Sequence, residues 1–182
     1  PSIRGPYHSF ELKDLVLEAK ALASIGVKEI IIIAQDTSIV GLDAKAPYDL
    51  KKLMEELSQI DGIEWIRVMY LNPMHLMENV LAAFTVKKVL PYFDIPFQHI
   101  SDKILSAMGR PSPGRDDIRL LVKTIRGSFK NAILRSSIIV GFPGEDRQDF
   151  DELISFVRET MFDRLGVFRY SPEENTLSYK MK

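Results

Sequence analysis

Several polar residues lie in or directly after short apolar runs, where a folded chain could bring them together. Arg135 lies inside such a run, and a charged group there needs an anionic partner, either a ligand carboxylate or an Asp such as Asp94. Gly141 lacks a Cβ, so a flat ring could approach the backbone closely. Acid–base chemistry of a metal-free lyase is a further reading for three residues, Asp36, His75 and His99, although no convincing Lys or carboxylate pair accompanies them. No catalytic residue is predicted.

Explanations without a ligand stay open for some of these places. Gln35 and Asp36 could only begin the next loop, because Asp and similar side chains favour turns. The segment Gly-Phe-Pro-Gly-Glu at 141–145 could be a tight turn whose Glu145 begins a helix. Two histidines without a carboxylate pattern are weak evidence for a metal, so no metal site is predicted.

Five apolar runs predict β-strands that would position these residues. They lie at residues 29–34, 65–70, 92–97, 133–140 and 165–170. The first run, Glu-Ile-Ile-Ile-Ile-Ala, is typical of a strand that is buried on both faces of a parallel sheet. Polar residues end all five runs.

Amphipathic helices are predicted between the strands. Apolar residues recur at spacings of three and four from Leu12 to Ala23, with Ser9 as the N-cap and Gly26 as a left-handed residue after the helix. Further helices are predicted at residues 48–60, 74–84, 102–108, 118–125 and 150–157.

The alternation of strands and helices predicts an α/β fold with right-handed βαβ units and a parallel sheet. Six such units would form an open partial barrel of the TIM type, and a doubly wound sheet is the competing architecture. The chain opens on a loop and a helix, so we expect a first strand to be missing ahead of Pro1. In either architecture ligands bind at the carboxyl ends of the strands, which predicts that Gln35, Gln98, Arg135 and Gly141 face one cavity.

The composition is that of one globular domain and sets limits on function. The 182 residues contain no Cys, so no disulfide or thiolate metal site can form within them. A formal charge of −1 predicts no nucleic-acid surface. No run approaches the ~20 apolar residues that a membrane helix needs, so no membrane partner is predicted. The first residue is not Met and the last has no evident stop, so both ends are expected to be cuts through a longer protein.

Four strand-end strings resemble those of the radical S-adenosylmethionine (SAM) methylthiotransferases. In chain order they are Ala-Gln-Asp-Thr at 34–37, Tyr-Phe-Asp-Ile-Pro-Phe-Gln-His at 92–99, Ile-Val-Gly-Phe-Pro-Gly-Glu at 139–145 and Phe-Arg-Tyr-Ser-Pro-Glu-Glu at 168–174. The opening Pro-Ser-Ile-Arg-Gly resembles the segment after that family's CxxxCxxC motif. The resemblance covers essentially the whole chain, and four such strings in order are hard to obtain by chance.

The resemblance implies a fold, cofactors and a transferase activity. It implies that residues 1–182 are a partial (βα) barrel core domain, lacking its first strand and cluster loop. The N-terminal methylthiotransferase domain, the cluster motif and the small C-terminal (TRAM) domain would lie outside. The implied cofactors are SAM and 4Fe–4S clusters, whose Cys ligands this chain does not contain. The implied reaction proceeds through a 5′-deoxyadenosyl radical that abstracts a substrate hydrogen.

Roles for individual residues follow from this resemblance. Gln35 and Asp36 would meet the ammonium group of SAM, and Arg135 or Ser137 its carboxylate or ribose. The cofactor-binding set is completed by Gln98 at the ribose and by an apolar wall for adenine, Val140, Gly141 and Phe142. Phe168 and Tyr170 would lie nearer the substrate.

Within the family, the strings resemble the RimO-like branch, which methylthiolates the β-carbon of an aspartate in a small-subunit ribosomal protein. The other branch, MiaB-like, modifies an adenosine in tRNA and typically shows Gln-Asn and Arg-Pro-Gly at the first and last places. Glu173 and Glu174 would also be poor neighbours for phosphates. Asn175 replaces the usual Gly, and Asn tolerates the left-handed conformation of such a turn. A cytoplasmic enzyme acting on a ribosomal protein or the small ribosomal subunit is therefore predicted, with tRNA or a non-catalytic SAM-binding fragment as alternatives.

Overall fold

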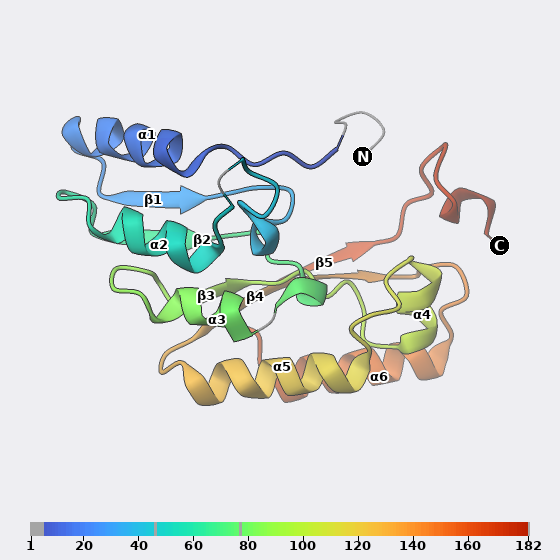
Figure 1. Cartoon of the computed structure of the whole chain (residues 1–182). Coiled ribbons are helices and arrows are strands. Elements are labelled where there is room, and N and C mark those ends of the chain that lie inside the picture. Colours follow the sequence, from blue (N-terminus) through green and yellow to red (C-terminus); the bar gives the residue numbers. More distant parts are fainter. Residues whose placement is uncertain (1–5, 46, 77, 182) are drawn as a thin grey trace. The chain divides into compact units, whose positions relative to one another are not determined.

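The computed structural model describes residues 6–45, 47–76 and 78–181. The chain divides into two compact units, Pro1–Leu90 and Pro91–Lys182, which Figure 1 follows in colour from blue to red. In both units helices alternate with parallel strands. The predicted α/β class with parallel strands is confirmed.

The first unit contains a two-stranded sheet and three α-helices. Its elements are α1 (Leu12–Ser24), β1 (Glu29–Ile32), α2 (Leu50–Ser58), β2 (Trp65–Val68) and α3 (Glu78–Ala82). β1 and β2 pair in parallel, with Ile30 opposite Ile66. α2 supplies much of the core, because its apolar residues recur on one face and Leu53, Met54 and Leu57 are almost completely buried.

The second unit contains a three-stranded parallel sheet in the order β3-β4-β5. Its elements are β3 (Tyr92–Asp94), α4 (Asp102–Ala107), α5 (Arg115–Ser128), β4 (Ile133–Val140), α6 (Arg147–Thr160) and β5 (Arg164–Arg169). Phe97 packs edge-on against Phe156 of α6 with the ring centroids 5.9 Å apart. Both rings are almost fully buried, so they belong to the core of this unit.

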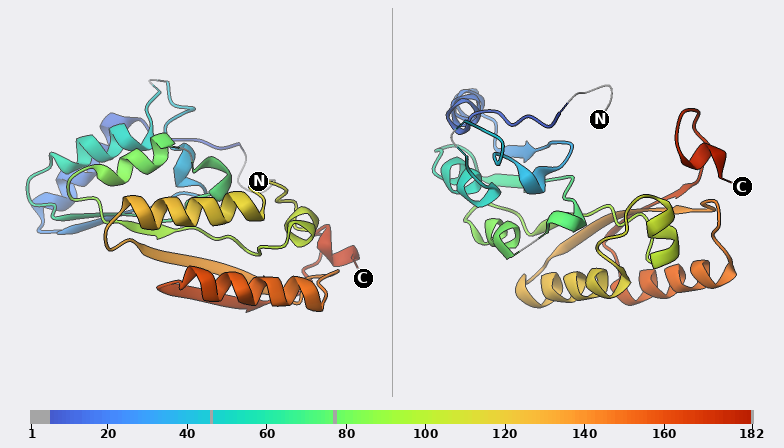
Figure 2. Two further views of the ribbon diagram at one scale, coloured as in Figure 1. Left: turned by 90° about the horizontal axis from the view of Figure 1, so that it is seen from below. Right: turned by 45° about the vertical axis from the view of Figure 1, so that its right-hand side comes forward.

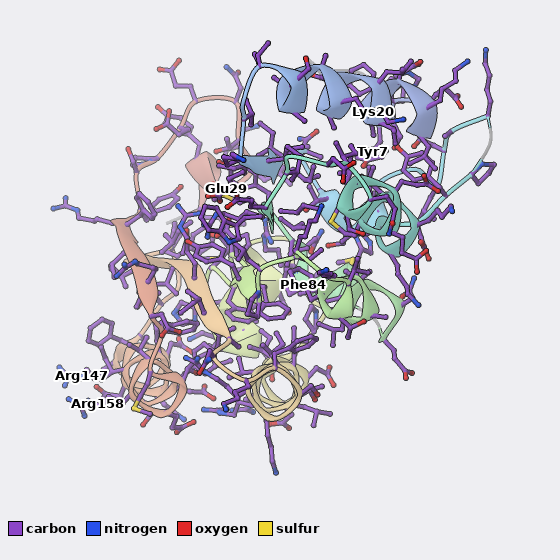
Figure 3. The ribbon with its side chains drawn as sticks, turned by 90° about the vertical axis from the view of Figure 1, so that its left-hand side faces the viewer. Tyr7, Lys20, Glu29, Phe84, Arg147 and Arg158 are labelled. Carbon is purple, nitrogen blue, oxygen red and sulfur yellow. The ribbon has the colours of Figure 1, made fainter. Side chains whose placement is uncertain are left out.

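The two long helices of the second unit lie side by side. Figure 2 shows both on the same side of the sheet, and Figure 3 shows them end-on, with Arg147 and Arg158 labelled on α6. Two ion pairs join the helices, Arg115 to Glu152 at 3.0 Å and Arg119 to Glu159 at 3.2 Å. These pairs are partly exposed, and such pairs contribute only about 0–1 kcal/mol each.

Two local predictions for the first unit are wrong. Ser9 does not cap α1, whose N-cap is Glu11; instead its hydroxyl accepts a hydrogen bond from the Gly41 amide at 2.8 Å. The run 29–34 is not buried on both faces, since Ile31 and Ile33 are 50% and 66% exposed. The reason is that Ile31 and Ile33 project from the same face of β1, because side chains alternate along a strand, whereas Ile30 on the other face is buried.

Other local predictions are confirmed fully or in part. Gly26 has a φ of +93°, as expected for a left-handed residue after α1. The predicted helix at 74–84, which includes the undescribed Met77, is replaced in its described part by α3 and two 3₁₀ turns, Pro73–His75 and Ala83–Thr85. β3 ends at Asp94 rather than at Phe97, because the Ser136 hydroxyl replaces the backbone partners of the ladder: it donates to the Ile95 carbonyl at 2.7 Å and accepts from the Phe97 amide at 3.2 Å. No described helix is long and apolar enough to cross a membrane.

Candidate functional site

The carboxyl ends of β1 and β2 are tied together by a Thr and a Ser that follow β1. The Thr37 hydroxyl donates to the Met69 carbonyl at 2.6 Å, and the Ser38 hydroxyl accepts from the Asn72 amide at 3.0 Å. Both side chains are buried, so they fix the two loops that follow these strands. Polar residues on the two loops are therefore held beside one another.

Asp36 caps the turn that follows β1 and orients the ring of His75. Its Oδ1 accepts from the Ser38 amide at 2.9 Å, which caps the 3₁₀ turn Thr37–Ile39. Its Oδ2 lies 2.7 Å from Nδ1 of His75. The turn-capping role left open by the sequence is confirmed. An ammonium group would have to share an oxygen that already has a partner, so the ammonium role of Asp36 stays a prediction, as does that of the exposed Gln35.

The sequence indicated Asp36 and His75 as separate candidates but did not predict that they would bind each other. A carboxylate accepts hydrogen bonds, so Nδ1 of His75 carries a proton and, in the neutral ring, Nε2 presents its lone pair. The His75 side chain is 34% exposed and that of Asp36 only 13%. The carboxyl ends of adjacent parallel strands meet at one edge, and this rule could have predicted the pair.

In the second unit, Arg135 forms the ion pair that the sequence left open. Arg135 lies opposite Asp94 in the β3–β4 register, and its guanidinium donates to Asp94 Oδ1 at 2.8 Å. Asp94 is almost buried, whereas 38% of the Arg135 side chain is exposed. A guanidinium has five N–H donors, so this pair leaves Arg135 able to bind a ligand carboxylate as well.

Arg135 and Ser137 project from the same face of β4, because side chains alternate along a strand. Gln98 is joined to this strand by two backbone hydrogen bonds: its amide donates to the Ser137 carbonyl at 2.9 Å, and its carbonyl accepts from the Ile139 amide at 2.8 Å. Gln98 has a φ of +70°, a left-handed value that few residues other than Gly adopt. The structure therefore places the Gln98 backbone against the strand that carries Arg135 and Ser137, where Gln98 pairs with Ile138.

The loop after β4 follows the same strand. Gly141 has a φ of +74°, and a Cβ built there would meet no heavy atom within 4 Å. The Phe142 ring lies 5.0 Å from that of Tyr170 in an edge-to-face contact. The Tyr170 hydroxyl is buried and has no hydrogen-bond partner among the described residues. Tyr170 thus lies beside the predicted adenine wall, whereas Phe168 is 58% exposed.

An open cavity of about 710 Å³ lies at this end of the sheet, and Val140, Gly141 and Tyr170 are among its lining residues. A Cβ at Gly141 would meet open space, and the Tyr170 ring is backed by the buried Phe142, which does not line the cavity itself. Gln98, Arg135 and Ser137 are not among the lining residues either. These features suit a ligand with a flat ring and polar substituents. The described residues contain no group of three or more His, Cys, Asp or Glu side chains that could hold a metal ion.

The first unit has a cavity of its own, of about 500 Å³, between residues 6–10, α1 and β1. Among the predicted site residues it includes Gln35 alone. Its lining is mostly apolar, including the exposed Ile31 and Ile33. Because Gln35 belongs to the first unit and Gln98, Arg135 and Gly141 to the second, a cavity common to all four stays a prediction.

Comparisons with known proteins bear on this arrangement. The family model of the Radical SAM superfamily matches residues 1–157. The proteins named ribosomal protein uS12 methylthiotransferase RimO from Alkaliphilus oremlandii, Acetivibrio thermocellus and Aquifex aeolicus are 46%, 48% and 46% identical over the whole chain. The chain spans only 42%, 40% and 42% of their lengths.

Two solved structures have a similar fold. The radical SAM methyltransferase TsrM from Kitasatospora setae aligns with a TM-score of 0.67 at 16% identity, covering 87% of this chain and 31% of its own. Coproporphyrinogen III oxidase (HemN) from Escherichia coli aligns with a TM-score of 0.68 at 17% identity, covering 94% and 39%. At this level of identity the likeness concerns the fold, and it agrees with the predicted architecture.

Proposed function

Because the chain belongs to the radical SAM superfamily, we propose that it is the core domain of a cytoplasmic transferase that methylthiolates ribosomal protein uS12. The observation that carries this proposal is the high identity, over the whole chain, to proteins that bear this name. The target atom that the family resemblance implies is the β-carbon of an aspartate. The remaining domains of such an enzyme would lie outside these 182 residues.

The second unit fits the SAM that this superfamily uses. Gly141 would let the adenine ring approach the backbone beside Phe142, and Gln98 would hydrogen-bond the ribose. Arg135, held in place by Asp94, would bind the methionyl carboxylate. The buried hydroxyl of Tyr170 is a further polar group beside the ring wall. These residues bind and orient SAM; none of them is assigned a proton transfer.

The chain contains no Cys and therefore offers no thiolate to a 4Fe–4S cluster. The cluster ligands would come from residues outside this chain. SAM and the cluster supply the radical chemistry that removes a hydrogen from the substrate. The contribution of this chain is to place SAM and to shield it from water with the apolar wall of Val140 and Phe142.

A protein substrate is favoured over tRNA by the acidic turn after β5. Glu173 and Glu174 are both exposed, and exposed carboxylates repel the phosphates of RNA. Asn175 in the same turn has a φ of +66°, so the left-handed turn survives the replacement of Gly by Asn. The acidic side chains would suit a basic ribosomal protein better than a nucleic acid.

The proposal is tested with the full-length protein, a chemical reductant and SAM, offered a uS12 peptide and tRNA in the same reaction. We expect mass spectrometry to show an SCH₃ group in place of one hydrogen on the peptide and no modified adenosine. Modification of tRNA with an unchanged peptide would overturn the proposal in favour of the MiaB-like alternative. The 182-residue chain by itself is expected to form no 5′-deoxyadenosine.

A further inference from the structure

His99 is a polar side chain with no exposed surface. Its Nδ1 accepts a hydrogen bond from the Ser101 amide at 2.9 Å. A ring nitrogen that accepts has no proton, so the proton of the neutral ring lies on Nε2. Burial lowers the pKa of His99, although Glu145 and other nearby carboxylates act in the opposite direction, and this favours the neutral ring.

The Nε2–H group of His99 faces Glu145. It has no hydrogen-bond partner among the described residues, and Glu145 Oε1 lies 3.9 Å from Nε2. That distance is too long for a hydrogen bond, but a movement of about 1 Å by either side chain would form one. The Glu145 side chain is itself 6% exposed, so the contact is shielded from water.

Glu145 controls the loop that follows β4. Its Oε2 accepts from two consecutive backbone amides, those of Gly141 and Phe142, the latter at 3.0 Å. The Glu145 amide in turn donates to the Phe142 carbonyl at 2.9 Å. The Glu145 carboxylate therefore holds the loop through Oε2, while its other oxygen, Oε1, points toward His99.

His99 also controls the turn that carries Gln98. It directly follows Gln98, whose left-handed backbone is held by β4 on one side. On the other side, the Ser101 amide binds the His99 ring, and the Ser101 hydroxyl donates to Asp149 of α6 at 2.7 Å. The buried ring thus anchors the chain directly after Gln98.

We propose that His99 is a positioning residue that couples the Gln98 turn to the Gly141–Glu145 loop, so that both form one pre-shaped wall for the nucleoside of SAM. This inference rests on the proposed function for the identity of the ligand, but the coupling itself is a property of the ligand-free protein. Sequence reasoning treated His99 as an acid–base or metal candidate, and its burial and contacts assign it this different role.

Two substitutions test the two ring nitrogens of His99 separately. His99→Asn keeps an acceptor near Nδ1 for the Ser101 amide but removes the donor toward Glu145. His99→Gln keeps a donor near Nε2 but removes the acceptor for Ser101. Ser101→Ala is the matched control, because it disturbs the same core through Asp149 and leaves both His99 contacts in place.

The first readout is amide hydrogen exchange of the segment 138–146 in the ligand-free, full-length protein. Removal of the Nε2–H group that lies 3.9 Å from Glu145 Oε1 predicts exchange roughly three- to tenfold faster in His99→Asn, with His99→Gln and Ser101→Ala close to the wild type in this segment. Glu145→Gln should accelerate exchange alone, and adding His99→Asn to it should have little further effect. Unchanged exchange in His99→Asn, or fully additive effects in the double variant, would overturn the coupling. Should His99→Asn fail to fold, the reciprocal measurement decides: Glu145→Gln should also accelerate amide exchange in the segment 98–101, and unchanged exchange there would overturn the coupling.

The second readout is the dissociation constant of S-adenosylhomocysteine, an unreactive analogue of SAM, measured by calorimetry. We expect His99→Asn to weaken binding roughly three- to tenfold and Ser101→Ala to leave it unchanged. A wild-type affinity retained in His99→Asn would overturn the proposed wall. Absence of binding to the wild-type protein would instead count against the proposed function, while the exchange experiment would still decide on the coupling.

Discussion

Asp149 is a buried carboxylate whose contribution to stability should depend on pH. Its side chain is 10% exposed, accepts from the Ser101 hydroxyl and the Asp146 amide, and pairs with Lys103. Burial by itself raises the pKa of Asp149, but the hydrogen bonds from Lys103, Ser101 and the Asp146 backbone outweigh it, and the pKa falls from 3.8 to about 2. Asp149 thus anchors the Ser101 side of the His99 turn in its charged form.

The size of the effect follows from the two pKa values. A fall from 3.8 to about 2 corresponds to about 2 kcal/mol of unfolding free energy, at about 1.4 kcal/mol for each pKa unit. The folded-state pKa is the lower one, so this stabilisation is fully present above about pH 4. It is lost as the pH falls from about 4 to about 2, where the folded protein also binds the proton.

Asp149→Asn removes this charge, and urea unfolding of the 182-residue chain at pH 7, 5, 4 and 3 measures the result. We expect the variant to be about 2 kcal/mol less stable than the wild type at pH 7, and the difference to fall to about half at pH 3. Asp151→Asn is the control, because Asp151 lies on the same helix in an exposed pair with Arg147 and should change stability by less than about 1 kcal/mol. A difference for Asp149→Asn that is the same at pH 7 and pH 3 would refute the reasoning.

Three further substitutions test the strand ends. Asp36→Ala removes the cap of the turn Thr37–Ile39 and should cost about 1 kcal/mol in unfolding free energy by urea denaturation; no loss would contradict the capping role. Arg135→Ala removes a charged hydrogen bond to the buried Asp94 and should cost about 2 kcal/mol, with Arg135→Lys recovering only part of it in the same assay. Gly141→Ala forces a side chain into a left-handed backbone at φ +74°; thermal unfolding should show a loss of about 1 kcal/mol, and S-adenosylhomocysteine should bind more weakly in calorimetry because the added methyl group occupies the open space.

Much of the fold could be predicted because the strands and helices are strongly patterned. β4 has the bounds that its apolar run predicted, Ile133–Val140, and α5 and α6 contain their predicted stripes. The errors occur where a local signal competes with tertiary contacts. Ser9 resembles an N-cap in sequence, but its hydroxyl binds Gly41, 32 residues away, which no local pattern records.

The site was predictable at the level of strand ends but not of side-chain partners. Arg135 needed an anion, and the register of β3 and β4 supplied Asp94, one of the two predicted partners. The contacts of His75 with Asp36 and of His99 with Glu145 join residues 39 and 46 positions apart. Their residue types were noticed, yet their pairing depends on which strands and loops lie next to one another. The left-handed backbone of Gln98 likewise carries no sequence signal, because Gln rarely adopts it.

We propose that the full protein methylthiolates ribosomal protein uS12, and the mass of uS12 from cells tests this proposal most directly. In the source organism, deletion of the gene should remove an SCH₃ group from uS12, and return of the gene should restore it, with the adenosines of tRNA unaffected throughout. An unchanged mass of uS12 after deletion, together with the loss of a methylthio group from tRNA, would contradict the claim.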